Sequence, residues 1–239
     1  MSGPWDERRA AAEQEHLDDP ALGGGGPSPF LLWALPHLRT HVTGGDLIEL
    51  GAGSGRDAHR WATEGFRVRT VDFAPSAVER ADARRRALGE PYRSRWRVVD
   101  AEAGRFLRSV PPSSVDAVVA HLVYGGFNAD ELAVAWAEIY RILRPGGVHA
   151  YAVSTPRSPR STGSDDPPSA SEDGETTPGR ERSFRIADLE ALDAGRFAEV
   201  AHSVRSDLHQ IYRVTRCVRP PPRPPGVAGV GPRDHSVGF

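Results

Sequence analysis

The chain has 239 residues, a formal net charge of −2 and a single cysteine, Cys217. This length suits one domain with additional segments, and one cysteine excludes an intrachain disulfide and a cysteine zinc cluster. The nearly balanced charge gives no global field that would favour nucleic acid or an anionic membrane. No apolar run reaches the ~18–20 residues of a membrane span, and the charged N-terminus lacks the apolar core of a signal peptide. We therefore expect a cytoplasmic protein with no metal site and no membrane or nucleic-acid partner.

Residues 1–43 precede the first expected strand and include four consecutive glycines, which form a flexible hinge. An apolar run from Pro29 then predicts a helix, because proline suits the first helical turn. This helix either packs on the edge of the domain or forms part of a lid. As a lid, it would offer Trp5, Phe30 or Trp33 as an apolar wall over a ligand.

The most informative stretch is DLIELGAGSGRD, residues 46–57. It predicts a buried strand, a turn with three glycines at alternate positions, and the start of a helix. Such a turn lets backbone approach a ligand closely, and the helix start offers unpaired N–H groups. The pattern differs from the GxGxxG of dinucleotide sites, because Arg56 replaces the last glycine. Glu49 would repel a pyrophosphate but would pair with an ammonium group. The alternative is a plain glycine-rich turn.

The second expected strand, residues 67–72, ends in Asp72. In an open α/β sheet, ligands bind at the carboxyl ends of the strands, where an acid can accept from both hydroxyls of a ribose. Phe73 would then pack on the face of an adenine. The alternative is an aspartate that only shapes the turn after the strand.

The third expected strand, residues 96–100, also ends in an acid, Asp100. This carboxylate would accept from the exocyclic amine of adenine, and the backbone N–H of Ala101 or Glu102 would complete the contact. The alternative is a helix N-cap, a position at which aspartate is strongly preferred.

Strands and helices continue to alternate along the chain, which predicts an α/β fold with a parallel, doubly wound sheet. The closing elements are a helix and two strands of a hairpin. The remaining elements are expected at residues 115–120 (strand), 132–143 (helix), 148–153 (strand), 186–192 (helix), 199–206 (strand) and 210–218 (strand).

Taken in order, these segments resemble the Rossmann-like, class I S-adenosylmethionine (SAM) methyltransferases over residues 44–218. DLIELGAGSGRD resembles their motif I, VRTVD the second-strand acid and VVDAE the adenine-side segment. VDAVVAHLVYGGF and YRILRPGGVHAYAVS are similar to the fourth strand and to the helix and fifth strand that follow. WDER and PSPF, ahead of motif I, are similar to the tellurite-resistance and thiopurine methyltransferase-like branch.

The resemblance implies a three-layer sandwich around a seven-stranded, mostly parallel sheet with one reversed strand. It divides the chain into a cap or lid (1–43), a SAM-binding domain (44–218) and a disordered tail rich in proline and glycine (219–239). A flexible loop at 154–183 departs from the usual segment after the fifth strand and leaves the substrate open.

The same resemblance implies which residues meet SAM. The methionine part would lie against Glu49 and the turn formed by Gly51, Ala52, Gly53 and Gly55. Asp72 would hold the ribose, and Asp100 with Ala101 the adenine.

His121 and Tyr124 are the catalytic candidates. By resemblance His121 lies beside the sulfonium, and its ordinary pKa near ~6.5 suits a general base. Equally, it would hydrogen-bond near the cofactor without moving a proton. Tyr124 would present an aromatic face to the sulfonium cation.

We expect a methyltransferase that acts on an O, N, S or C atom of a small molecule, which is compatible with bacterial natural-product biosynthesis or resistance. DNA amino-methylating relatives place an N/D-P-P-Y tetrad where this chain has HLVY. The alternatives are a protein or RNA methyltransferase, and a protein that binds SAM without transferring methyl, either cyclase-like or structural. The chain would be a monomer or a homodimer.

Overall fold

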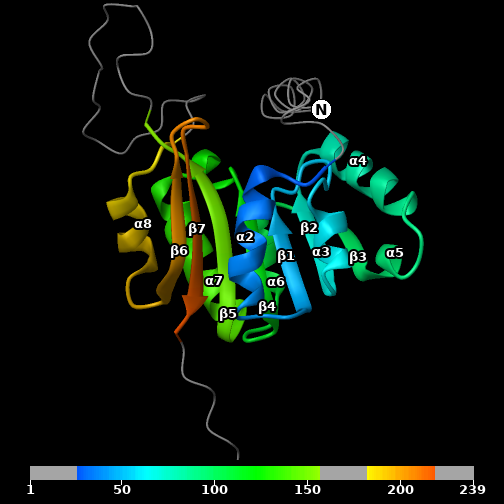
Figure 1. Ribbon diagram of the computed structural model, residues 1–239, viewed down its shortest axis with the longest axis horizontal. Helices are drawn as coiled ribbons and strands as arrows, with labels where there is room; N and C mark the ends of the chain where they lie inside the picture. Colours follow the sequence, from blue (N-terminus) through cyan, green and yellow to red (C-terminus); the bar gives the residue numbers. More distant parts are fainter. Residues whose placement is uncertain (1–25, 157–181, 219–239) are drawn as a thin grey trace, which may run out of the picture.

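The computed structural model describes residues 26–156 and 182–218. Trp5, the WDER segment, most of the expected loop at 154–183 and the tail from residue 219 lie outside the described residues. Seven strands form one sheet in the order β3-β2-β1-β4-β5-β7-β6 (Figure 1). The strands are β1 (Gly45–Leu50), β2 (Phe66–Asp72), β3 (Trp96–Asp100), β4 (Val115–His121), β5 (Leu143–Ser154), β6 (Phe197–Arg205) and β7 (Gln210–Cys217).

Helices cover both faces of this sheet. They are α2 (Pro29–Arg39), α3 (Ala58–Thr63), α4 (Pro75–Arg86), α5 (Tyr92–Arg95), α6 (Ala103–Ser109), the short 3-10 helix η1 (Tyr124–Gly126), α7 (Ala129–Ile142) and α8 (Ile186–Asp193). Among the described residues, no helix is long and apolar enough to cross a membrane.

Strands β1 to β5 run parallel, while β7 is antiparallel to both of its neighbours. The expected sheet with one reversed strand is therefore confirmed, as is the closing hairpin. The central strands β1 and β4 bury apolar residues on both of their faces because helices cover the sheet from both sides. Leu47, Ile48 and Leu50 of β1 are fully buried.

Two hydrophobic cores lie on the two faces of the sheet. Alternate residues of β4 face opposite ways, so Val118 and Ala120 join the core under α6, α7 and α8, while Ala117 and Val119 join the core under α2 and α3. Trp136 of α7 is fully buried in the first of these cores. The three-layer architecture expected from the resemblance is confirmed.

Two features differ from the expectation. Strand β5 begins at Leu143, because Leu143 pairs with Val115 before the register shifts and Val148 pairs with Ala117. Gly146 and Gly147, which lie between the expected helix and the expected strand, therefore belong to an irregularity within β5. The short helix α5 was not expected.

Helix α2 lies on a face of the sheet, where it contacts β5 and β7. Ser28 caps its N-terminus by accepting a hydrogen bond from the backbone N–H of Leu31. Phe30, Leu31 and Leu38 of this helix are fully buried. The described part of the N-terminal segment is thus packed into the domain, and a lid role stays a proposal.

Candidate functional site

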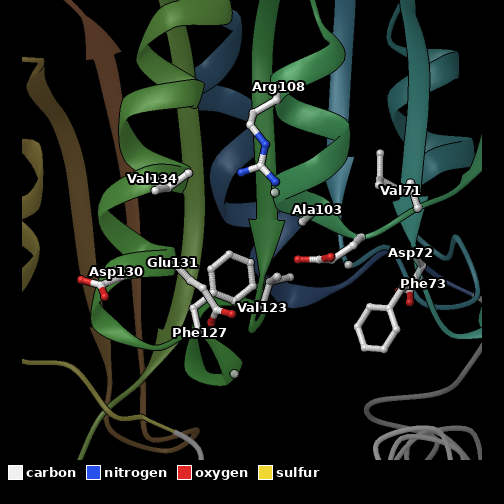
Figure 2. A pocket seen from close by; sticks show the side chains of 15 residues that line it. Val71, Asp72, Phe73, Ala103, Arg108, Val123, Phe127, Asp130, Glu131 and Val134 are labelled. Carbon is white, nitrogen blue, oxygen red and sulfur yellow. The ribbon is translucent and has the colours of Figure 1, made fainter. Parts of the chain in front are cut away.

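A cavity of about 520 Å³ opens at the carboxyl ends of β1, β2 and β4 and extends between α6 and α7 (Figure 2). This is the end of the sheet at which an open α/β fold binds its ligands. Its walls include Gly51, Asp72, Phe73, Ala101, Glu102 and Val123. Figure 2 shows Phe73 at one end, and Phe127 and Glu131 of the α7 side near the middle. Five of the expected cofactor contacts, at residues 51, 72, 73, 101 and 102, therefore share one cavity.

The glycine turn after β1 adopts a backbone conformation that few other residues accept. Gly51 has φ +58°, in the left-handed region, and its N–H donates to the carbonyl of Val71 at 2.8 Å. A Cβ at Gly51 would lie 2.4 Å from Cγ2 of Val123. The glycine is therefore required both by backbone angle and by the cavity wall opposite.

Asp72 holds the glycine turn against the end of β2. One carboxylate oxygen accepts from the N–H of Gly53 and the other from the N–H of Ala74, both at 3.0 Å. The side chain is buried but lines the cavity. Because each carboxylate oxygen carries two lone pairs, Asp72 retains acceptor capacity for a ribose hydroxyl.

The adenine side differs in part from the expectation. The N–H of Ala101 donates to the carbonyl of Asp72 at 3.0 Å, so this donor is already engaged between β2 and the residue after β3. Asp100 is exposed and is not among the residues that line the cavity. Glu102 does line it, and Phe73, 42% exposed, stands at its rim. Of the two backbone donors expected for adenine, only that of Glu102 remains a candidate.

Glu49 is the buried acid beneath the glycine turn. Its Oε2 atom has no hydrogen-bond partner among the described residues. Burial raises the pKa of this carboxyl well above its usual range; the charge of Asp57 adds to the effect, and that of Arg56 opposes it. A buried carboxylate oxygen without a donor is costly, and an ammonium group placed at the turn would satisfy it. The unpaired Oε2 atom of Glu49 therefore fits the ammonium group at the amino-acid end of SAM.

The two catalytic candidates lie on opposite faces of the sheet. The ring of His121 stacks on Phe30 of α2, with centroids 5.2 Å apart and an interplanar angle of 18°. Tyr124 is fully buried in the core beneath α7, where its hydroxyl lies 2.8 Å from Nε2 of His149. Burial raises the pKa of Tyr124 well above its usual range. Neither lines the cavity, and the placement of Tyr124 is that of a packing residue.

Several residues of this region were not assigned a role from the sequence. Val123 and Arg108 line the cavity; neither stands in a pattern that distinguishes it from an ordinary core or surface residue. Asp57 accepts two hydrogen bonds from Ser28. The acid two residues after the last glycine of the turn was a visible signal for this contact, but its partner lies 29 residues away.

Comparisons with known proteins agree with this fold. Residues 48–151 match the family described as "Methyltransferase domain". Over 139 residues the chain is 29% identical to a malonyl-[acyl-carrier protein] O-methyltransferase from Serratia marcescens, and this stretch covers 58% of the chain and 44% of that relative. The chain thus spans less than half the length of this curated relative.

Among solved structures, the fold is similar to that of the 1,6-didemethyltoxoflavin-N1-methyltransferase of Burkholderia thailandensis, which holds its substrate and S-adenosylhomocysteine (SAH). The TM-score is 0.60 at 19% identity over 92% of each chain. The N-methyltransferase NodS of Bradyrhizobium japonicum, in complex with SAH, has a TM-score of 0.62 at 14% identity, over 87% of this chain and 98% of that one. A TehB-like methyltransferase from Corynebacterium glutamicum has a TM-score of 0.59 at 16% identity, over 90% and 100%.

The chain therefore has the fold of the class I SAM-dependent methyltransferases. Its glycine turn and Asp72 lie at the carboxyl ends of β1 and β2, the edge at which an open α/β sheet binds ligands. The cofactor of this class is SAM.

Proposed function

We propose that the chain is a SAM-dependent methyltransferase whose acceptor is a small molecule. The observation that carries the proposal is the pairing of an open nucleoside-sized cavity with an unsatisfied buried carboxylate oxygen on Glu49 at the adjoining glycine turn. A cofactor with a nucleoside at one end and an amino acid at the other suits both features. We propose residues 44–218 as the domain that binds it, with α2 in the segment that caps it.

Each residue then has a distinct task. Asp72 accepts from the ribose, Phe73 and Val123 enclose the adenine, and Glu102 lies along its edge. Glu49 accepts from the ammonium group of the methionine part, for which its pKa, although raised by burial, falls again once a cation is near. Asp100 and Ala101 contribute through the shape of the loop after β3 and not through the contacts first expected.

SAM supplies an already activated methyl group, so the protein has mainly to orient the acceptor in line with the bond that breaks and to exclude water. We propose that His121, at the carboxyl end of β4, takes a proton from an acceptor that must lose one. Phe30 holds its ring by stacking. Tyr124 supports the same loop from the core side.

The class of acceptor is supported by the named relatives. The toxoflavin-type neighbour methylates a nitrogen of a small heterocycle and the Serratia relative an oxygen of a malonyl group. The 29% identity to the latter favours, as a second candidate, a carboxylate presented on a carrier protein. The narrower tellurite-resistance and thiopurine branch rests on the TehB-like neighbour and on sequence segments ahead of motif I.

The test is calorimetric titration of the full chain with SAM and SAH. We expect the wild type to bind both, and Asp72→Asn to bind SAH at least about tenfold more weakly, because a charge-assisted hydrogen bond to the ribose is lost. Asp207→Asn, at an exposed acid in the β6–β7 turn, is the matched control and should bind as the wild type does. No binding by the wild type refutes the cofactor; undiminished affinity in Asp72→Asn refutes the ribose contact.

A further inference from the structure

A chain of buried hydrogen bonds joins helix α2 to the glycine turn. Asp57 follows the turn directly at the start of α3, and its Oδ1 atom accepts from the backbone N–H of Ser28 at 2.7 Å. Its Oδ2 atom accepts from the hydroxyl of Ser28 at 2.5 Å. The same hydroxyl oxygen accepts from the N–H of Leu31 at 3.0 Å and so caps α2. Ser28 therefore connects the first turn of α2 to the end of the glycine turn.

This connection is fully enclosed. Ser28 is 0% and Asp57 is 5% exposed. Burial raises the pKa of Asp57, and the two hydrogen bonds from Ser28 and the nearby Arg56 and Arg84 act in the opposite direction. Without Ser28 the carboxylate would be buried with its main donors gone, which is costly enough to displace the backbone that carries it. The position of the turn thus depends on where α2 begins.

Helix α2 extends the connection across the sheet. Two residues after Ser28, the ring of Phe30 stacks on His121 and meets Tyr212 of β7 edge-on at 5.4 Å. Phe30 is fully buried, so it cannot move without disturbing both rings. The glycine turn after β1 and the end of β4 are therefore linked through α2 as well as through the sheet.

We propose that Asp57 and Ser28 are positioning residues that couple binding at the glycine turn to the seating of α2 over His121. This inference rests on the proposed function. Neither side chain lines the cavity, so their effect on a ligand passes through the backbone of the turn. Because coupling is reciprocal, SAH bound at the turn stabilises the seated α2, and loosening the first turn of α2 weakens SAH binding.

Ser28→Ala tests this coupling with the full chain. It removes the hydroxyl that bridges Asp57 and Leu31 and keeps the backbone donor. Two quantities are measured: SAH affinity by calorimetry, and hydrogen exchange of peptides that cover residues 29–39 with and without SAH. In the wild type we expect SAH to slow exchange in α2. In Ser28→Ala we expect faster exchange in α2 and about tenfold weaker SAH binding. Adding Asp57→Asn to Ser28→Ala should weaken binding no further than the more affected single variant.

Ile139→Val is the control for general destabilisation, since Ile139 is fully buried in α7, in the core on the opposite face of the sheet from α2. It should leave SAH affinity and exchange in α2 unchanged. Undiminished affinity in Ser28→Ala, an equal loss in Ile139→Val, or no effect of SAH on α2 exchange overturns the coupling and leaves the proposed function standing. Failure of the wild type to bind SAH overturns the proposed function and the coupling with it.

Discussion

His149 of β5 should make the stability of this protein fall steeply in mild acid. The imidazole is fully buried, and its Nε2 atom shares a hydrogen bond with the hydroxyl of Tyr124. Aromatic rings surround it, with the centroids of Tyr151 and Trp136 at 4.6 and 5.2 Å. Burial lowers the pKa of His149 to about 3. The native state therefore holds a neutral imidazole across a range in which an exposed histidine is charged.

The magnitude follows from proton linkage. Between the ordinary histidine pKa of ~6.5 and about 3, the unfolded chain binds a proton that the native state does not. Stability is thus fully present above the unfolded pKa and falls as the pH drops, by ~1.4 kcal/mol per pH unit. At pH 5 the loss from this one residue is about 2 kcal/mol, a large share of the 5–15 kcal/mol typical of a domain.

Urea unfolding at pH 7 and pH 5 measures this loss in wild type and in His149→Gln, which stays neutral at both values. We expect the wild type to lose about 2 kcal/mol more than the variant between the two pH values. Asp193 and Arg213 form an ion pair in the same interior. Because both proteins contain this pair, its contribution to the pH dependence of stability cancels in the comparison. Tyr124→Phe is the control, because it removes the hydroxyl and should keep the pH dependence. Equal losses in wild type and His149→Gln would refute the neutral, buried imidazole.

Two further predictions concern the site. Gly51→Ala should lower the free energy of unfolding clearly more than Gly146→Ala does, and it should also weaken SAH binding. Both glycines have positive φ, a conformation that costs alanine ~1–2 kcal/mol. Only at Gly51 would the new methyl group also meet the cavity wall, at Val123. Chemical unfolding and calorimetry measure both effects, and equal costs at the two positions would contradict the close approach. His121→Phe keeps the stack on Phe30 and removes the nitrogen atoms. With an acceptor that must lose a proton, it should bind SAH normally and lose most of its turnover; a pH profile of kcat like that of the wild type would exclude the base role.

The local signals of this chain were sufficient for its fold class. Alternation of short apolar runs with helical patterns, and the acids that end β2 and β3, indicate a parallel sheet with ligands at one edge, because burial on both faces dictates an apolar strand. The glycine turn could be identified because glycine adopts left-handed backbone angles at little cost, so a glycine at position 51 itself indicates a turn with positive φ. Glu49 and Asp72 could be predicted as ligand contacts because they stand next to such elements.

Contacts between distant segments had no such signal. The proline- and glycine-containing segment after α7 became part of β5, since pairing with β4 outweighs the local preference to stop. Tyr124 lies in η1, after β4 has ended, and its ring enters the core beneath α7, whereas His121 at the end of β4 stacks on Phe30 of α2. The backbone N–H of Ala101, expected at the adenine, donates instead to the carbonyl of Asp72 in β2. Residue type and spacing along the chain thus determined the class of fold and the kind of ligand, whereas the partners of His121, Tyr124 and Asp57 were decided by packing between layers, which depends on segments far apart in sequence.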